Sequence, residues 1–184
     1  MLARKTVFGL CAFLAISIQA GSVRAQPMPS EREDAQRIGD LVIANHILAR
    51  SEHSRRLEPC QHSLGRKPKH FYLSRSVAPA LVKPEDIMEY DEDSNPVDAR
   101  GRALYLERFI HGEVYRARPE VNAVIHSHSP AVIPFSMTGV PLRMAFLLGA
   151  FLGSGAPVFE IREAAGTETN MQITDNARGA ALAK

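Results

Sequence analysis

The stretch Asn122-Ala-Val-Ile-His-Ser-His-Ser-Pro130 indicates both a structural element and a candidate site. Its apolar run contains two β-branched residues and predicts a short buried strand that ends in two histidines. On a strand, residues i and i+2 point to the same face, so His126 and His128 would project together with about 7 Å between their Cα atoms. Two imidazoles in this arrangement can hold one metal ion. From the spacing alone, a pair in which one histidine packs and the other is solvated is an equally good interpretation.

The N-terminus has the residue order of a secretory signal peptide. Arg4 and Lys5 precede an almost continuous apolar run at 7–18, and small residues follow at the −3 and −1 positions of a cleavage site. The apolar run is short for a membrane span. We therefore expect a signal peptide over 1–25, an exported protein that is periplasmic or secreted, and no stable membrane span after cleavage. An uncleaved N-terminal anchor is the alternative.

The net charge of +2 comes mostly from this leader. Without Arg4, Lys5 and Arg24, 19 basic residues remain against 20 acidic ones, so the mature chain is near neutral and we expect no nucleic-acid partner. Cys60 is then the only cysteine, which excludes an intrachain disulfide. The 184 residues suit one domain with a real core.

Helix-like and strand-like segments alternate after the leader, which predicts an α/β layered domain over 34–184. We expect a linker over 26–33, within which Ser30 and Glu33 form a capping-box pattern for a helix that runs to about Ser51. The further predicted elements are strands at 71–74, around 126 and at 158–161, a helical turn at 83–88, and helices at 104–116, 129–138 and 176–184.

Residues 52–70 form a polar, basic segment without periodicity, which predicts a loop. His53, Cys60 and His62 lie in this segment, but their spacing fits no closed zinc site.

Glu107 is the acid that could serve a metal at the two histidines. It lies on a predicted helix one turn before His111, and a turn at Arg118-Pro119 can bring that helix beside the His126 strand. Periodicity alone favours a solvated surface residue, because glutamate on a helix is usually exposed.

The segment from Leu106 to Pro130 closely resembles the class II aldolase/adducin family, which includes fuculose- and rhamnulose-phosphate aldolases and ribulose-phosphate 4-epimerase. The acid, the Tyr115-Arg-Ala-Arg-Pro119 turn and the His-Ser-His motif all occur in register. The resemblance extends, with lower specificity, over 34–184. It implies a three-layer α/β/α domain with a central, mainly antiparallel sheet that is incomplete at its C-terminus.

The same resemblance implies roles for particular residues. His126 and His128 would bind Zn²⁺ or another divalent metal, and Glu107 would be the catalytic acid/base. Ser74, Arg75 and Ser76 match a region that often binds the acidic end of the substrate, although a simple turn is an equally good interpretation there. The implied activity is metal-assisted carbon–carbon cleavage of a small carbonyl compound, of aldolase or decarboxylase type, in a tetramer.

Three departures from the family pattern bear on that activity. The family has a third histidine in a Gly-His-Gly-like segment, and this sequence contains no histidine after His128. Residues 52–70 lack the family's glycine loop, as a local reading-frame error would produce. Tyr105-Leu106 replaces a serine pair, which argues against phosphate binding. We expect an impaired lyase; a non-catalytic adducin-like interaction module and a truncated product without a stable fold are the alternatives.

Overall fold

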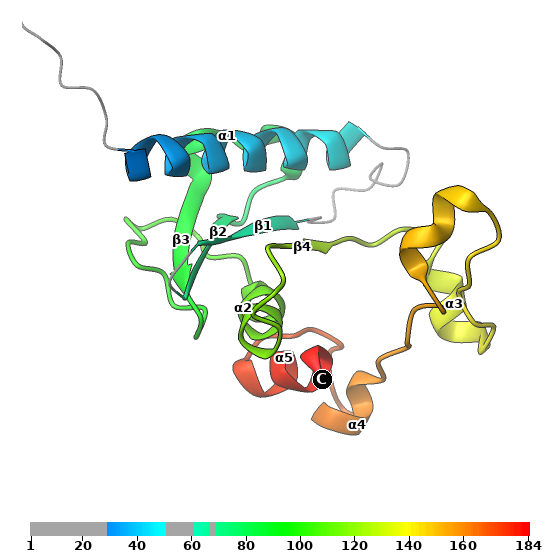
Figure 1. Cartoon of the computed structure of the whole chain (residues 1–184). Coiled ribbons are helices and arrows are strands. Elements are labelled where there is room, and N and C mark those ends of the chain that lie inside the picture. The colour runs from blue at the N-terminus through cyan, green and yellow to red at the C-terminus, as the bar shows by residue number, and fades with distance from the viewer. Residues whose placement is uncertain (1–28, 51–60, 67–68) are drawn as a thin grey trace, which may run out of the picture.

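The computed structural model describes residues 29–50, 61–66 and 69–184, and the predicted signal peptide lies outside them. Helices and strands alternate along the chain, as predicted (Figure 1). The helices and strands are α1 (Pro29–Arg50), β1 (Gln61–Arg66), β2 (His70–Ser74), β3 (Ile87–Asp91), α2 (Arg108–Ala117), β4 (Ala123–His126), α3 (Ile133–Thr138), α4 (Ile161–Ala165) and α5 (Asn176–Ala183). Three 3₁₀ turns, η2 (Pro79–Leu81), η3 (Pro84–Asp86) and η4 (Leu147–Leu152), complete the described elements.

The four strands form one sheet in the order β3-β2-β1-β4, and each neighbouring pair is antiparallel. Figure 1 shows α1 across one face of this sheet and α2 with α5 on the other. The described residues therefore form the predicted three-layer α/β/α arrangement. No helix in the described part of the chain is long and apolar enough to cross a membrane.

Side chains of strand β2 contribute to the hydrophobic core on both faces of the sheet. Phe71 and Leu73 are fully buried among the tyrosines on the α2 side, and Tyr72 packs with Leu41 of α1 on the opposite side. This alternation follows from the two-residue period of a strand. Because both faces are covered, the strand has a continuous apolar run, which is why its position was predictable from the sequence.

Helix α1 covers the sheet with one face and leaves the other in solvent. Leu41 is fully buried, whereas Ile43 is 58% exposed. The polar exception on the buried face, Asn45, is also fully buried, and its side-chain amide donates to the Leu41 carbonyl oxygen at 2.8 Å. His46 lies against the Val82 carbonyl oxygen, with 2.9 Å between Nε2 and O.

Several predicted boundaries were wrong. The loop expected over 52–70 contains strand β1 at 61–66, because pairing on both sides with β2 and β4 fixes an extended backbone that the side-chain pattern does not indicate. The linker expected over 26–33 overlaps the first turn of α1. The helix expected from residue 104 begins at Arg108, and Leu106, which precedes the helix, is 47% exposed.

The strand expected at 158–161 is also absent. Ile161 instead begins helix α4, and the carboxylate of Glu160 caps that helix by accepting from the Arg162 N–H at 2.9 Å. Strand β3 was missed, because it directly follows a 3₁₀ turn whose residues indicate the start of a helix.

Helix α5 packs closely against α2 on the far side of the sheet. Asp175 caps α5 by accepting from the Arg178 N–H. Gly179 is buried where the two helices meet, and Ile173, just before α5, is buried with Ile110 and Ile161. The last helix is therefore packed against α2.

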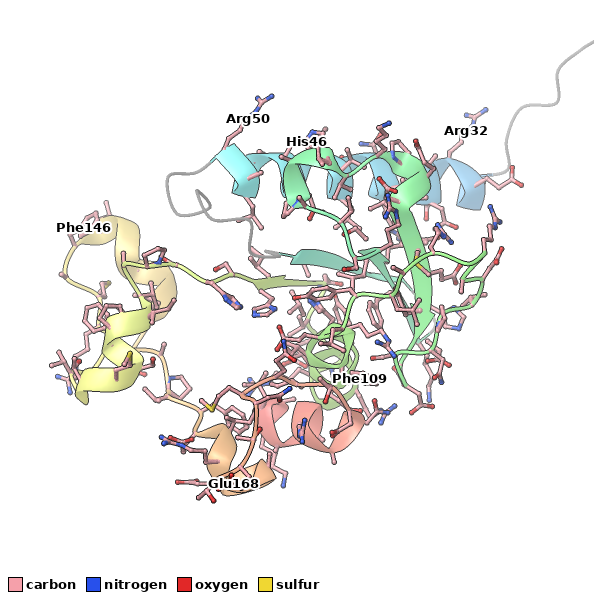
Figure 2. The ribbon with its side chains drawn as sticks, turned by 180° about the vertical axis from the view of Figure 1, so that it is seen from behind. Arg32, His46, Arg50, Phe109, Phe146 and Glu168 are labelled. Atoms are coloured by element: carbon pink, nitrogen blue, oxygen red, sulfur yellow. The ribbon has the colours of Figure 1, made fainter. Side chains whose placement is uncertain are left out.

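Residues 130–159 extend away from the sheet (Figure 1). This outlying segment contains α3 and η4, and Phe146 lies on it, apart from the body of the molecule (Figure 2). Its large apolar side chains are mostly exposed. They are Val132, Ile133, Met137, Val140, Met144, Phe146, Leu147, Val158 and Phe159.

Candidate metal centre

Three side chains that can ligate a metal meet where β4 ends and α2 begins. His126 is the last residue of β4, His128 follows two residues later, and Glu107 immediately precedes α2. One ligand atom from each lies within 4.8 Å of the other two. The two Nε2 atoms of the histidines are 3.0 Å apart, and Oε2 of Glu107 lies 3.9 Å from Nδ1 of His126. The structure thus brings together the three residues that the sequence singled out.

The Glu107 carboxylate is held in place by a segment distant in the sequence. Its Oε1 accepts from the Ile173 backbone N–H at 3.1 Å, while Oε2 faces His126. The side chain is 15% exposed, so the carboxylate is largely removed from water but still reachable. The prediction of a solvated glutamate from periodicity alone was therefore wrong, because α5 and the residues before it cover this part of α2.

The environment keeps His126 in the form that binds metals. Burial lowers its pKa below the ordinary value; the nearby Glu107 carboxylate opposes this shift, and His128 adds to it. A histidine with a lowered pKa is neutral at neutral pH and has one free nitrogen lone pair. Its Nδ1 also lies 3.0 Å from the Tyr105 hydroxyl, a contact that the sequence did not reveal.

The donor set is chemically suited to a divalent transition metal. Two imidazole nitrogens and a carboxylate oxygen are among the usual ligands of zinc, and catalytic zinc sites commonly have three protein ligands and an open position. In the described part of the chain, this is the only group of three histidine, cysteine, aspartate or glutamate residues close enough to share an ion. His62 lies on β1, and His53 and Cys60 fall outside the described residues.

Ser74, Arg75 and Ser76 lie at the same end of the strands as His126. Gln61 of β1 pairs with His126, and β2 ends one residue before the position opposite Gln61. Two strand spacings, about 10 Å, therefore separate this turn from the histidine. The turn is also tied to the segment before Glu107, because the Ser76 N–H donates to the Ala103 carbonyl oxygen at 2.9 Å.

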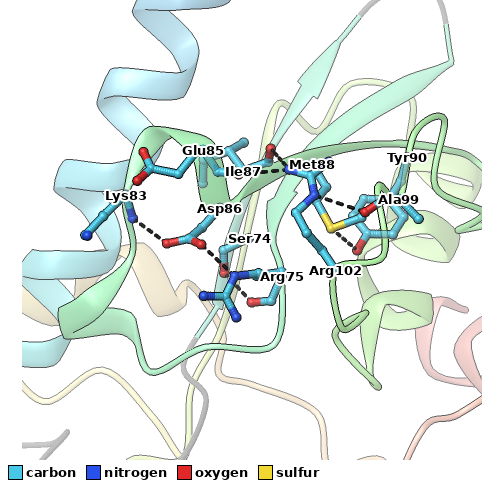
Figure 3. A network of polar contacts seen from close by, with 10 residues as sticks. All are labelled: Ser74, Arg75, Lys83, Glu85, Asp86, Ile87, Met88, Tyr90, Ala99 and Arg102. Atoms are coloured by element: carbon cyan, nitrogen blue, oxygen red, sulfur yellow. Dashed lines mark hydrogen bonds and ion pairs between the residues drawn. The ribbon is translucent and has the colours of Figure 1, made fainter.

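The side chains of Ser74 and Arg75 have polar partners nearby (Figure 3). The Ser74 hydroxyl donates to the Arg75 carbonyl oxygen at 3.2 Å, and the Arg75 guanidinium donates to Asp86 at 2.6 Å. Burial raises the pKa of Asp86, but Arg75 and the Lys83 N–H outweigh that effect and hold the pKa below its ordinary value.

Arg75 lines two surface cavities, of about 540 and 600 Å³, and Glu107 and the two histidines line neither. The structure therefore does not place this turn in contact with the three metal-site residues.

Comparison with known proteins identifies the fold family. The family described as "Class II Aldolase and Adducin N-terminal domain" matches residues 41–183. Two curated relatives are decarboxylases. Decarboxylase tropJ of Talaromyces stipitatus is 43% identical over 93 residues, which are 50% of this chain and 35% of that protein. The 3,4-dihydroxyphthalate decarboxylase of Arthrobacter keyseri is 32% identical over 91 residues, which are 44% of this chain and 36% of that protein.

Solved structures show the same fold. The L-fuculose-1-phosphate aldolase from Thermus thermophilus superposes with a TM-score of 0.63 at 19% identity, over 81% of this chain and 69% of that one. The L-fuculose 1-phosphate aldolase from Glaciozyma antarctica superposes with a TM-score of 0.56 at 28% identity, over 66% and 51% of the two chains. The match to the curated relatives spans about a third of their length. The chain belongs to the class II aldolase/adducin family.

Proposed function

We propose that this protein is a metal-dependent carbon–carbon lyase that acts on a small oxygenated carbonyl compound. The observation that carries the proposal is the convergence of Glu107, His126 and His128, with ligand atoms within 4.8 Å, in a member of the class II aldolase family. The metal is Zn²⁺ or another divalent ion of similar ligand preference, because the donors are two imidazoles and a carboxylate.

Each residue has a separate task in this proposal. His126 and His128 would hold the ion through imidazole nitrogens. A bound divalent cation would polarise the substrate's carbonyl and hydroxyl oxygens. Glu107 would accept or donate the proton at Oε2, since its other oxygen is fixed by the Ile173 N–H. Limited exposure of the Glu107 and His126 side chains, 15% and 16%, would strengthen these electrostatic interactions.

We propose decarboxylation as the form of cleavage, supported by the two decarboxylase relatives. In this reaction the bond from the substrate carbon to its carboxylate breaks, CO₂ leaves, and the carbon takes up one proton. Glu107 is placed to deliver that proton. Tyr105 stands where the resemblance to the sugar-phosphate aldolases would place a serine, and its side chain is buried in the core, which argues against phosphate binding at this position.

The test compares metal-loaded wild type with Glu107→Gln for CO₂ release from 3,4-dihydroxyphthalate and for cleavage of fuculose 1-phosphate. We expect metal-dependent CO₂ release from the carboxylate, lower by about 10² to 10⁴-fold in Glu107→Gln. Glu168→Gln, a substitution of an exposed glutamate, is the matched control and should retain the wild-type rate. A Glu107→Gln variant as active as wild type, or activity that survives chelation, would contradict the proposal.

A second candidate is a non-catalytic interaction module. The exposed apolar side chains of the outlying segment favour it, because contiguous apolar surface commonly marks protein–protein contact. This candidate predicts a folded protein whose melting temperature is the same with and without chelator. A melting temperature that rises on adding Zn²⁺ would favour the lyase instead.

We also propose that the mature chain is exported and assembles as a tetramer. The leader-like sequence over 1–25 supports export, and the exposed apolar segment, together with aldolase-family neighbours, supports assembly. N-terminal sequencing of the exported protein should begin near Gln26. Light scattering should give four times the chain mass, and a monomeric mass would contradict the assembly proposal.

A further inference from the structure

Tyr105 connects the apolar core to the candidate metal centre. Its side chain is 2% exposed and belongs to the buried cluster that includes Phe71 and Tyr115. Its ring meets that of His111 edge-on, with 6.4 Å between centroids. The backbone is also restrained, because the Arg108 guanidinium donates to the Tyr105 carbonyl oxygen at 3.0 Å. Packing therefore fixes the ring, and with it the position of the hydroxyl.

The Tyr105 hydroxyl lies at the boundary of the core, next to the ring nitrogen of His126 that faces away from His128. The distance from Tyr105 Oη to His126 Nδ1 is 3.0 Å, and the opposite nitrogen, Nε2, lies 3.0 Å from Nε2 of His128. One ring thus presents Nδ1 to the tyrosine and Nε2 to the other histidine. A neutral imidazole has a single N–H, so the partner at one nitrogen decides whether the other offers a lone pair.

The surroundings of Nδ1 favour a proton on that atom. Two oxygens face it, the Tyr105 hydroxyl at 3.0 Å and Oε2 of Glu107 at 3.9 Å. An ionised carboxylate can only accept, and its negative charge favours an N–H over a lone pair at the neighbouring nitrogen. The tyrosine oxygen can accept from Nδ1–H while its own proton points elsewhere. The lone pair of His126 is then on Nε2, which faces His128.

We propose that Tyr105 is a positioning residue that holds His126 in the Nδ1–H tautomer and directs its Nε2 lone pair toward the metal position shared with His128. The metal part of this inference rests on the proposed function, whereas the tautomer is a property of the metal-free chain. Hydrogen-bond partners of metal-binding histidines commonly contribute about 10- to 100-fold to metal affinity, so loss of the hydroxyl should weaken binding by that factor.

The test uses Tyr105→Phe, which keeps the ring in the core and removes only the hydroxyl. Tyr90→Phe is the matched control, because Tyr90 is fully buried in the same cluster and its hydroxyl contacts Met88 and the backbone of Tyr105 but not His126. The ¹⁵N chemical shifts of the His126 ring in the metal-free chain, at a pH where the imidazole is neutral, report the tautomer. Titration with Co²⁺ reports the affinity.

We expect an Nδ1–H tautomer of His126 in wild type and in Tyr90→Phe, and a mixture or an Nε2–H tautomer in Tyr105→Phe. Co²⁺ affinity should fall about 10- to 100-fold only in Tyr105→Phe. An Nε2–H tautomer in wild type would overturn the inference, and so would equal losses of affinity in both variants. If wild type binds no Co²⁺, the proposed function fails, while the tautomers of the metal-free proteins still decide the role of Tyr105.

Discussion

Replacement of Gly179 by alanine tests how closely α5 must approach α2. A Cβ atom at Gly179 would lie 2.6 Å from the carbonyl oxygen of Phe109 and 2.9 Å from Cγ of Glu113. The first of these neighbours belongs to the backbone of α2, which cannot move without displacing the helix. Gly39 on α1 is the matched control, since a Cβ there would meet nothing within 4 Å.

The magnitude follows from two opposing terms. Alanine is favoured over glycine within a helix by about 1 kcal/mol, so Gly39→Ala should raise the free energy of unfolding by about that amount. At Gly179 the same gain is opposed by overpacking, which costs about 1–3 kcal/mol. We therefore expect the free energy of unfolding of Gly179→Ala to be about 1–3 kcal/mol lower than that of Gly39→Ala.

Urea denaturation of both variants and wild type measures this difference. The displacement should also be felt at the metal centre, because Ile173, just before α5, donates its N–H to Glu107. Co²⁺ affinity should consequently fall in Gly179→Ala and stay unchanged in Gly39→Ala. Equal stabilisation by the two substitutions would refute the close packing of α5 on α2, and with it the account of how Glu107 is held.

Two further predictions concern the other side of the sheet. The pKa of Asp86 is lowered from 3.8 in the folded state, so its contact with Arg75 stabilises the protein above pH 3.8 and is lost as pH falls through the lower folded pKa. Urea unfolding over this pH range should show the stability gap between wild type and Asp86→Asn closing in acid; a gap independent of pH would disprove the assignment. Leu41→Ala, at a fully buried position, should cost about 2–5 kcal/mol, whereas Ile43→Ala, at a position 58% exposed, should change stability by less than about 0.5 kcal/mol. Similar losses in the two variants, measured by thermal unfolding, would show that α1 does not pack as described.

Much of the fold could be predicted because several of its strands and helices are indicated by local residue patterns. The apolar run that ends at His126 identified β4, the run at Phe71 identified β2, and the helix predicted at 176–184 is α5. Strand β1 could not be recognised in the same way. It pairs on both sides, with β2 and with β4, and this tertiary pairing fixes an extended backbone in a segment whose residues show no alternation.

The residues of the candidate site were predictable from the sequence, but the contacts that hold them in place were not. The spacing of His126 and His128 placed them together, and the family resemblance added Glu107. The Ile173 N–H that holds Glu107 is 66 residues away, so no local pattern reveals the contact. The Tyr105 hydroxyl was missed because a buried tyrosine is usually a core residue, and only the packing of the strand beside it shows where the hydroxyl points.

The metal content of the purified chain tests directly whether His126 and His128 bind a metal ion. Elemental analysis should be carried out on wild type, on the His126→Ala/His128→Ala double variant, and on His46→Ala. His46 is the control because its side chain contacts Val82 and is not part of the candidate site. We expect one divalent ion per chain in wild type and in His46→Ala, and none in the double variant. Wild-type protein without metal, or a double variant that retains it, would contradict the assignment of His126 and His128 as the metal-binding residues.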